Sequence, residues 1–175
     1  HDQTEAMTLG TRIVVMKDGV VQQVDTPQNL YQKPGNLFVA GFMGSPQMNF
    51  LDAQIAEKGG DLIAKVGEYD IVIPAAKAKV LKDGGYVGKT VVLGIRPEDI
   101  HDSQMFIEAS PSVPMTSTVK VYELLGAEVF LYFDVNGTQV TARVDRRPTA
   151  KTGDPIKFAF DMEKCHCFDT GTERT

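Results

Sequence analysis

The sequence contains no tryptophan, only two cysteines and no long hydrophobic run. A membrane-spanning helix needs about 20 consecutive apolar residues, and a secretory signal needs a basic flank before its apolar core; neither pattern is present. Cys165 and Cys167 are separated by one residue, and this spacing cannot close a useful stabilising disulfide loop. These absences predict a folded protein of a reducing compartment such as the cytoplasm.

Positive charge is also scarce. The net charge is -5 and no block of like charges occurs, so the sequence lacks the basic stripe that binding to a nucleic-acid backbone requires. The 175 residues are 42% apolar, which is enough for one sizeable core or two small ones. Because the first residue is His1 rather than methionine, we expect the chain to be part of a longer gene product.

Local signals in residues 1–46 predict a short segment of mixed α and β structure. Asp2 and Glu5 have the spacing of a capping box, which predicts a helix that ends at Gly10. Two β-rich runs flank the pair Asp18-Gly19, which favours a tight hairpin because aspartate and glycine tolerate positive φ angles. Two more short helices are expected after the hairpin. Their predicted N-caps are Thr26 and Asn36, and the sequence Gly44-Ser45-Pro46 ends the second helix.

From residue 47 onward, short β-rich runs separated by turn residues dominate the sequence. The predicted strands cover residues 50–56, 61–66, 69–73, 89–95, 115–124, 128–135, 138–144 and 156–160. Only residues 75–82 have a helical pattern there, and Asn136-Gly137 is a strong hairpin turn. So many strands at this spacing predict a mainly β fold in which residues 47–175 close into a small barrel resembling an oligonucleotide/oligosaccharide-binding (OB) fold.

Several stretches carry a resemblance to a known family. They are His1-Asp2-Gln3 with Glu5 to Leu9, Arg12 to Gly19, Gln23 to Tyr31, Phe38 to Phe50, Gly94-Ile95-Arg96-Pro97-Glu98, and Phe168 to Gly171. In this order they resemble the carboxy-terminal part of ATP-binding cassette (ABC) importer ATPases of the carbohydrate-uptake type, similar to the maltose and glycerol-3-phosphate importer ATPases. The resemblance covers most of the chain and is loose between these stretches.

The resemblance implies a division of the chain and a set of partners. Residues 1–46 would be the tail of a nucleotide-binding domain, and residues 47–175 a transport-associated OB (TOBE) domain. The complete subunit would bind ATP and Mg²⁺, contact membrane permease subunits on the inner face of the cell membrane, and import sugars or related solutes. The barrel would form homodimer contacts and, in some importers, dock a regulatory protein.

His1 matches the switch histidine of this family, whose imidazole contacts the γ-phosphate. As the first residue with no phosphate cradle nearby, His1 is expected to be catalytically inert in this chain. The nearest match to a P-loop is residues 83–90, where Asp83 occupies the position of the first required glycine and a strand follows instead of a helix. We therefore predict a glycine-rich turn there, no cofactor site, and no ATP hydrolysis by this chain.

Two further clusters contain side chains that could bind a metal ion or a ligand. Cys165 and Cys167 would share one face of an extended strand, with His166 on the other, so at most two thiolates could reach a metal that prefers four ligands. We expect buried or half-buried thiols and no metal site. Arg96, Glu98 and Asp99 follow a strand in a proline turn. We expect Arg96 to fix this turn by charge-assisted hydrogen bonds, while a ligand or subunit contact remains the alternative.

The leading functional interpretation is a regulatory and dimer-stabilising region. The alternative is a module that binds a small oxyanion or sugar as an effector. An autonomous enzyme is not expected, because no nucleophile is paired with a base.

Overall fold

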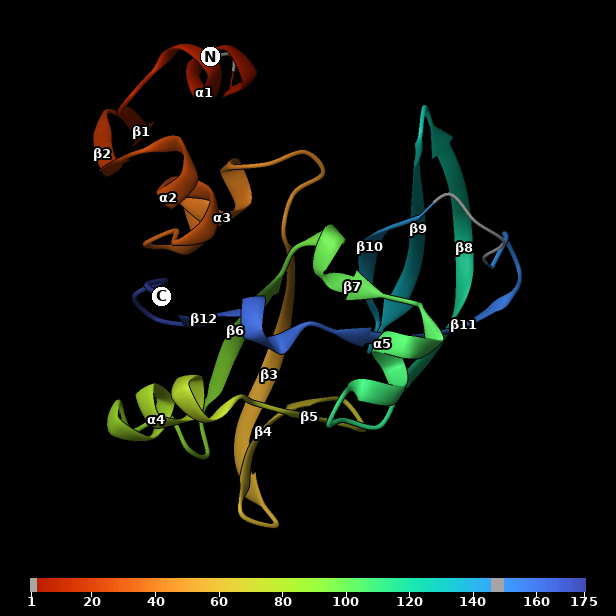
Figure 1. The fold of residues 1–175 in the computed structure, drawn as a ribbon. Helices are drawn as coiled ribbons and strands as arrows, with labels where there is room; N and C mark the ends of the chain where they lie inside the picture. The colour runs from red at the N-terminus through yellow and green to blue at the C-terminus, as the bar shows by residue number, and fades with distance from the viewer. Residues whose placement is uncertain (1–2, 146–149) are drawn as a thin grey trace.

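A computed structural model describes residues 3–145 and 150–175. The chain is mainly β, with short helices between the strands (Figure 1). In chain order, the elements are α1 (Gln3–Leu9), β1 (Ile13–Lys17), β2 (Val20–Asp25), α2 (Pro27–Gln32), α3 (Leu37–Phe42), β3 (Asn49–Lys58), β4 (Asp61–Val66), β5 (Tyr69–Val72), α4 (Ala75–Asp83), β6 (Thr90–Ile95), the 3₁₀ helix η1 (Pro97–Asp99), β7 (Ile100–His101), α5 (Gln104–Ala109), β8 (Met115–Leu125), β9 (Glu128–Val135), β10 (Thr138–Val144), β11 (Pro155–Phe160), the 3₁₀ helix η2 (Met162–Lys164) and β12 (His166–Asp169).

The elements expected before residue 47 are present. Strands β1 and β2 pair antiparallel, and both Asp18 and Gly19 have positive φ angles in the turn between them. The hydroxyl oxygen of Thr26 accepts the Asn29 amide at the start of α2. The side chain of Asn36 caps α3 in the same way, so both predicted N-caps are confirmed.

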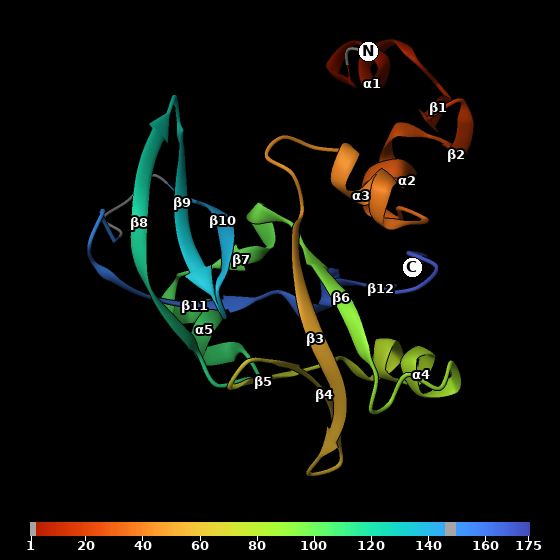
Figure 2. The ribbon, with the colours of Figure 1, turned by 180° about the vertical axis from the view of Figure 1, so that it is seen from behind.

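The remaining strands form two five-stranded antiparallel sheets in the described part of the chain. One has the order β10-β9-β8-β11-β7 and the other β12-β6-β3-β4-β5. Figures 1 and 2 show the sheets side by side, with the long β8–β9 hairpin projecting from one of them. The hairpin turn at Asn136-Gly137 is confirmed by positive φ angles at both residues.

One apolar core is shared by the two sheets. Its largest fully buried side chains come from both, for example Leu93 on β6 and Phe133 on β9. Asn49 links the sheets directly: its side chain donates to the Thr141 carbonyl oxygen at 2.9 Å and accepts the Thr141 amide at 2.9 Å. These contacts almost close the barrel, which confirms the predicted mainly β, OB-like fold.

The expectation that residues 75–82 form the only helix beyond residue 46 was wrong. Residues Gln104–Ala109 form α5, which is capped by the hydroxyl of Ser103. This helix is one and a half turns long and has no buried residue, so its sequence shows no amphipathic period. The strand β7 was also missed, because two residues are too few for a recognisable alternation. The extended strand expected around Cys165 and Cys167 corresponds to β12, which begins at His166.

Candidate functional site

Arg96 lies where the last barrel strand before η1 meets the amino-terminal segment. It follows β6 directly and precedes Pro97, which fixes the first position of η1. The backbone of Arg96 is extended, and its side chain points towards α2 and α3. The residue is only 3% exposed, which makes Arg96 one of the few buried charged residues in the described chain.

The guanidinium group of Arg96 contacts both short helices. Nη2 donates to the carbonyl oxygen of Tyr31 in the last turn of α2, and Nη1 donates to the carbonyl oxygen of Met43 at the C-cap of α3, each at 2.8 Å. The last carbonyl groups of a helix lack partners within the helix. Arg96 therefore satisfies helix ends that lie 53 and 65 residues away in the chain.

Tyr31 also contacts the turn through its ring and its hydroxyl. The guanidinium carbon of Arg96 lies 3.8 Å from the centre of the Tyr31 ring, in cation–π geometry. The Tyr31 hydroxyl donates to the carboxylate of Glu98. Burial lowers the pKa of Arg96 to about 10, so the guanidinium keeps its positive charge at neutral pH. Arg96 and Glu98 thus converge on one tyrosine.

Gly44 makes room for this arrangement. Its φ angle is +102°, and a Cβ atom at this position would lie 3.0 Å from Nη1 of Arg96 and 3.2 Å from the Tyr31 ring. Both the backbone conformation and the close approach therefore require glycine. The sequence marked Gly44 as a helix breaker but gave no sign of this contact.

Asp99 belongs to a different neighbourhood. Its backbone carbonyl accepts the Asp161 amide at 2.8 Å, and its carboxylate lies 3.8 Å from Nζ of Lys164. Burial, together with the negative charge of Glu98, raises the pKa of Asp99 to about 6. Asp99 therefore fixes the turn against η2, whereas Arg96 and Glu98 face the amino-terminal segment.

The end of the chain makes a second connection to that segment. The Leu37 amide donates to the Glu173 carbonyl oxygen at 2.8 Å, and the Thr175 amide donates to the Gly35 carbonyl oxygen at 3.2 Å. The Thr175 hydroxyl donates to the Pro34 carbonyl oxygen at 2.5 Å. In Figures 1 and 2 the C-terminus accordingly lies next to α2 and α3.

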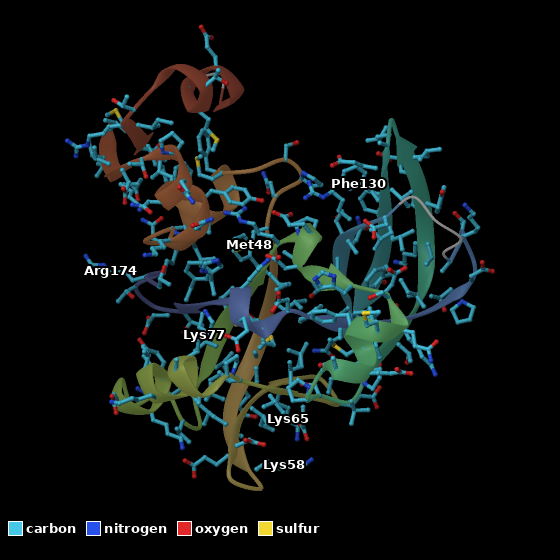
Figure 3. All side chains as sticks on the ribbon, in the orientation of Figure 1. Met48, Lys58, Lys65, Lys77, Phe130 and Arg174 are labelled. Atoms are coloured by element: carbon cyan, nitrogen blue, oxygen red, sulfur yellow. The ribbon has the colours of Figure 1, made fainter. Side chains whose placement is uncertain are left out.

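A small apolar cluster makes a third connection between the amino-terminal segment and the barrel. Ala40 from α3, Met48 and Phe168 from β12 form its buried centre. Figure 3 shows Met48 between the amino-terminal helices and the barrel. We call the Arg96 contacts, this cluster and the pairing of residues 173–175 with residues 34–37 the joint. The joint fixes the amino-terminal segment to the barrel at three points.

The turn resembling a P-loop does not fit a phosphate. Backbone amides of this turn, which would have to bind the phosphate oxygens, already have partners within the chain. The Gly88 amide donates to the Ile55 carbonyl oxygen and the Lys89 amide donates to the Tyr86 carbonyl oxygen. Helix α4 precedes this turn and strand β6 follows it, as expected for a turn that enters a barrel strand. His1, expected by resemblance to be the switch histidine, lies outside the described residues.

The thiols lie as expected. Cys165 is buried and Cys167 is half-buried, and both are free. The hydrogen bond with Cys167, followed by burial, raises the pKa of Cys165, whereas the same hydrogen bond lowers the pKa of Cys167. Within residues 3–145 and 150–175, no group of three or more His, Cys, Asp or Glu side chains is placed to hold a metal ion.

Comparison with protein families identifies the chain. Residues 44–100 match the MalK OB fold domain, and residues 93–168 match the TOBE domain. The two matches overlap at the end of β6 and the Arg96 turn. The chain belongs to the family defined by the MalK OB fold domain and the TOBE domain.

Curated relatives align along almost the whole chain. The oligosaccharides import ATP-binding protein MsmX of Bacillus subtilis is 46% identical over 99% of this chain and 46% of its own length. The trehalose/maltose import ATP-binding protein MalK of Thermococcus litoralis is 41% identical over 98% of this chain and 46% of its own. The chain thus spans about half the length of the curated relatives it matches.

Among the described residues, no helix is long and apolar enough to cross a membrane.

A solved structure shares the fold. The cytoplasmic molybdate-binding protein ModG, with molybdate bound, superimposes with a TM-score of 0.52 at 16% identity, over 68% of this chain and 94% of its own. At this identity, the likeness supports the OB-type fold alone.

Proposed function

We propose that this chain is the regulatory and dimerisation region of the ATP-binding subunit of a sugar importer. The names of the relatives support only the assignment to an importer subunit, because they describe ATP-binding proteins for oligosaccharide, multiple-sugar and trehalose/maltose import. The complete subunit would bind ATP with Mg²⁺ in a nucleotide-binding domain. It would work with permease subunits at the cytoplasmic face of the membrane.

In this proposal, residues 1–46 are the tail of the nucleotide-binding domain and residues 47–175 are the regulatory domain. The hairpin of β1 and β2 supports the division, because Val14, Met16, Val20 and Val21 are exposed on it. A two-stranded hairpin with so many exposed apolar side chains is marginally stable in water and needs a partner surface. The body of a nucleotide-binding domain would supply that surface.

The joint is the observation that carries the regulatory role. Arg96 contacts the ends of both α2 and α3. If the barrel moves, these helices must move with it or the two hydrogen bonds must break. Energetic coupling needs an element through which both regions act on one equilibrium. The joint would pass the position of the barrel to the nucleotide-binding domain.

The test uses the complete subunit assembled with its permease partners. We expect Arg96→Met to leave the basal ATP hydrolysis of the free subunit within about twofold, while the stimulation by transported solute falls. Arg143→Met is the matched control, because Arg143 forms a surface ion pair with Glu128 outside the joint. Full stimulation in Arg96→Met would reject the coupling role.

Self-association is proposed through the projecting hairpin. Val121, Leu124 and Leu125 expose apolar side chains on β8. Sedimentation should show the mass rising from the 19.1 kDa of one chain towards twice that value as the concentration increases. Leu125→Glu should shift the equilibrium to monomer. A strict monomer at high micromolar concentration would argue against this contact.

The same exposed surface could receive a regulatory protein in place of a second copy, and cross-linking from Leu125→Cys would distinguish the two.

The alternative function, binding of a small oxyanion or sugar, is favoured by one observation. A cavity of useful size lies between α4 and β12.

A further inference from the structure

The cavity beside β12 has the size and lining of a small-molecule site. Its volume is about 400 Å³, within the range of about 300–1,000 Å³ that ligand pockets occupy. It is open to solvent on one side and is lined by residues of α4, β6 and β12 and by the last two residues of the chain. The apolar side chains in its wall include Ala76, Val80, Leu81, Val91 and Phe168.

Two cationic side chains, Lys77 and Arg174, line the same cavity. Figure 3 shows them on the same side of the molecule, Lys77 on α4 and Arg174 beyond the end of β12. The ammonium group of Lys77 donates to the Cys165 carbonyl oxygen at 3.0 Å, which leaves two of its three N–H donors. In the described part of the chain, Arg174 forms hydrogen bonds through its backbone, and no acid pairs with its guanidinium group.

The anionic group in the lining is already satisfied. One oxygen of the Asp169 carboxylate accepts the Tyr86 hydroxyl at 2.6 Å, and the other accepts the amides of Gly171 and Thr172 at 2.8 Å each. These hydrogen bonds lower the pKa of Asp169 to about 2, so the carboxylate stays charged but is fully engaged.

His166 adds no positive charge to the cavity. Burial, reinforced by the positive charges of Lys77 and Arg96, lowers its pKa to about 4, so the imidazole is neutral near pH 7. Its ring can donate or accept one hydrogen bond at each nitrogen. The lining therefore carries the positive charges of Lys77 and Arg174 and the negative charge of Asp169, which is already hydrogen-bonded to neutral donors within the chain.

We propose that this cavity binds a small organic anion, with the anionic group between Lys77 and Arg174 and an apolar body against Val80, Leu81 and Phe168. Charge-assisted hydrogen bonds would orient the ligand, and burial of its apolar body would supply affinity. The proposal rests on the proposed regulatory function only for the role of the ligand as an effector. The cavity shares Phe168, Arg174 and Thr175 with the joint but none of the residues that contact Arg96, so the Arg96→Met test and the binding test can fail separately.

Binding is tested with matched probes on the 175-residue chain by two-dimensional amide NMR. The probes are 3-phenylpropionate, its neutral analogue 3-phenylpropan-1-ol, and inorganic phosphate. We expect 3-phenylpropionate to bind about tenfold more tightly than the alcohol, a difference of about 1.4 kcal/mol. Its saturable shifts should centre on residues 76–81 and 166–174. Equal affinities for acid and alcohol, or shifts scattered over the barrel, would overturn the proposal, as would binding of phosphate as tight as that of 3-phenylpropionate.

Three variants locate the anionic group. Arg174→Gln, on an exposed side chain, should weaken binding of 3-phenylpropionate about tenfold and leave binding of the alcohol unchanged. Val80→Asp, at a position 71% exposed on the cavity rim, should weaken it by repulsion without disturbing the core. Lys79→Gln is the control, because it removes one positive charge from the same helix outside the cavity lining. A loss in Lys79→Gln equal to that in Arg174→Gln would show a nonspecific effect of net charge and reject the site.

Discussion

Replacing Arg96 by lysine keeps the positive charge but should loosen the amino-terminal segment. The guanidinium group makes two charge-assisted hydrogen bonds and stacks on the Tyr31 ring. Each such bond stabilises by about 1.5–3 kcal/mol, and a cation–π contact by about 0.5–2 kcal/mol. A lysine ammonium can reach at most one of the two carbonyl oxygens and cannot stack as a plane. We therefore expect Arg96→Lys to lower the free energy of opening of residues 27–43 by about 2–4 kcal/mol.

Hydrogen exchange of backbone amides measures this opening directly. The amides of Leu30, Ala40 and Met43 are bonded within α2 and α3 and report on the segment. The expected loss corresponds to exchange about 30- to 700-fold faster in Arg96→Lys. The β9–β10 ladder should exchange at the parent rate, and Arg143→Lys should change neither region. If the amides of α2 and α3 kept their protection while the barrel amides lost theirs, Arg96 would act inside the turn and the joint would be refuted.

Three other substitutions test separate features by urea unfolding. Gly44→Ala should cost about 1–2 kcal/mol more than Gly59→Ala, because both glycines have positive φ but only at Gly44 would the new Cβ crowd Arg96. Asp99→Asn should stabilise the protein by about 1–2 kcal/mol at pH 7.5. The pKa of Asp99 is raised to about 6 in the folded state, so the protonated carboxyl favours folding below about pH 4. This contribution is lost as the pH rises through 6, where the carboxyl of the folded protein ionises. The advantage of Asp99→Asn should therefore vanish near pH 4. Asn49→Leu should cost about 2–4 kcal/mol, because it leaves the partly buried amide and carbonyl of Thr141 without this partner.

Elements with local causes could be predicted from the sequence. The hairpin around Asp18-Gly19 and the caps at Thr26 and Asn36 depend on residues within four positions of each other, so their signals lie in a short window. The long strands were predictable because their buried positions alternate, as along β3. Helix α5 was not, because it buries nothing and its stability depends on the Ser103 cap and the elements around it.

The candidate site was predictable only in part. The sequence singled out Arg96 and Glu98, and it favoured hydrogen bonds that would stabilise the turn itself. The structure instead gives Arg96 two acceptors from helix ends far away in the chain. No residue pattern near Arg96 specifies Tyr31 or Met43, because a backbone carbonyl is offered by every residue type. Tertiary packing alone selects which carbonyls Arg96 reaches.

That choice of partner explains why an arginine occupies this place. A buried guanidinium group paired with a carboxylate can often be replaced by apolar side chains without loss of stability. Burial of a charge therefore does not by itself explain why position 96 is an arginine. Paired with two carbonyl oxygens, its fork fixes the ends of α2 and α3 at one separation, because both N–H groups belong to one rigid plane. Leucine or methionine could fill the same volume, but their apolar contacts are not directional and would not fix the positions of the helix ends. An arginine here therefore fixes the ends of α2 and α3 relative to the barrel.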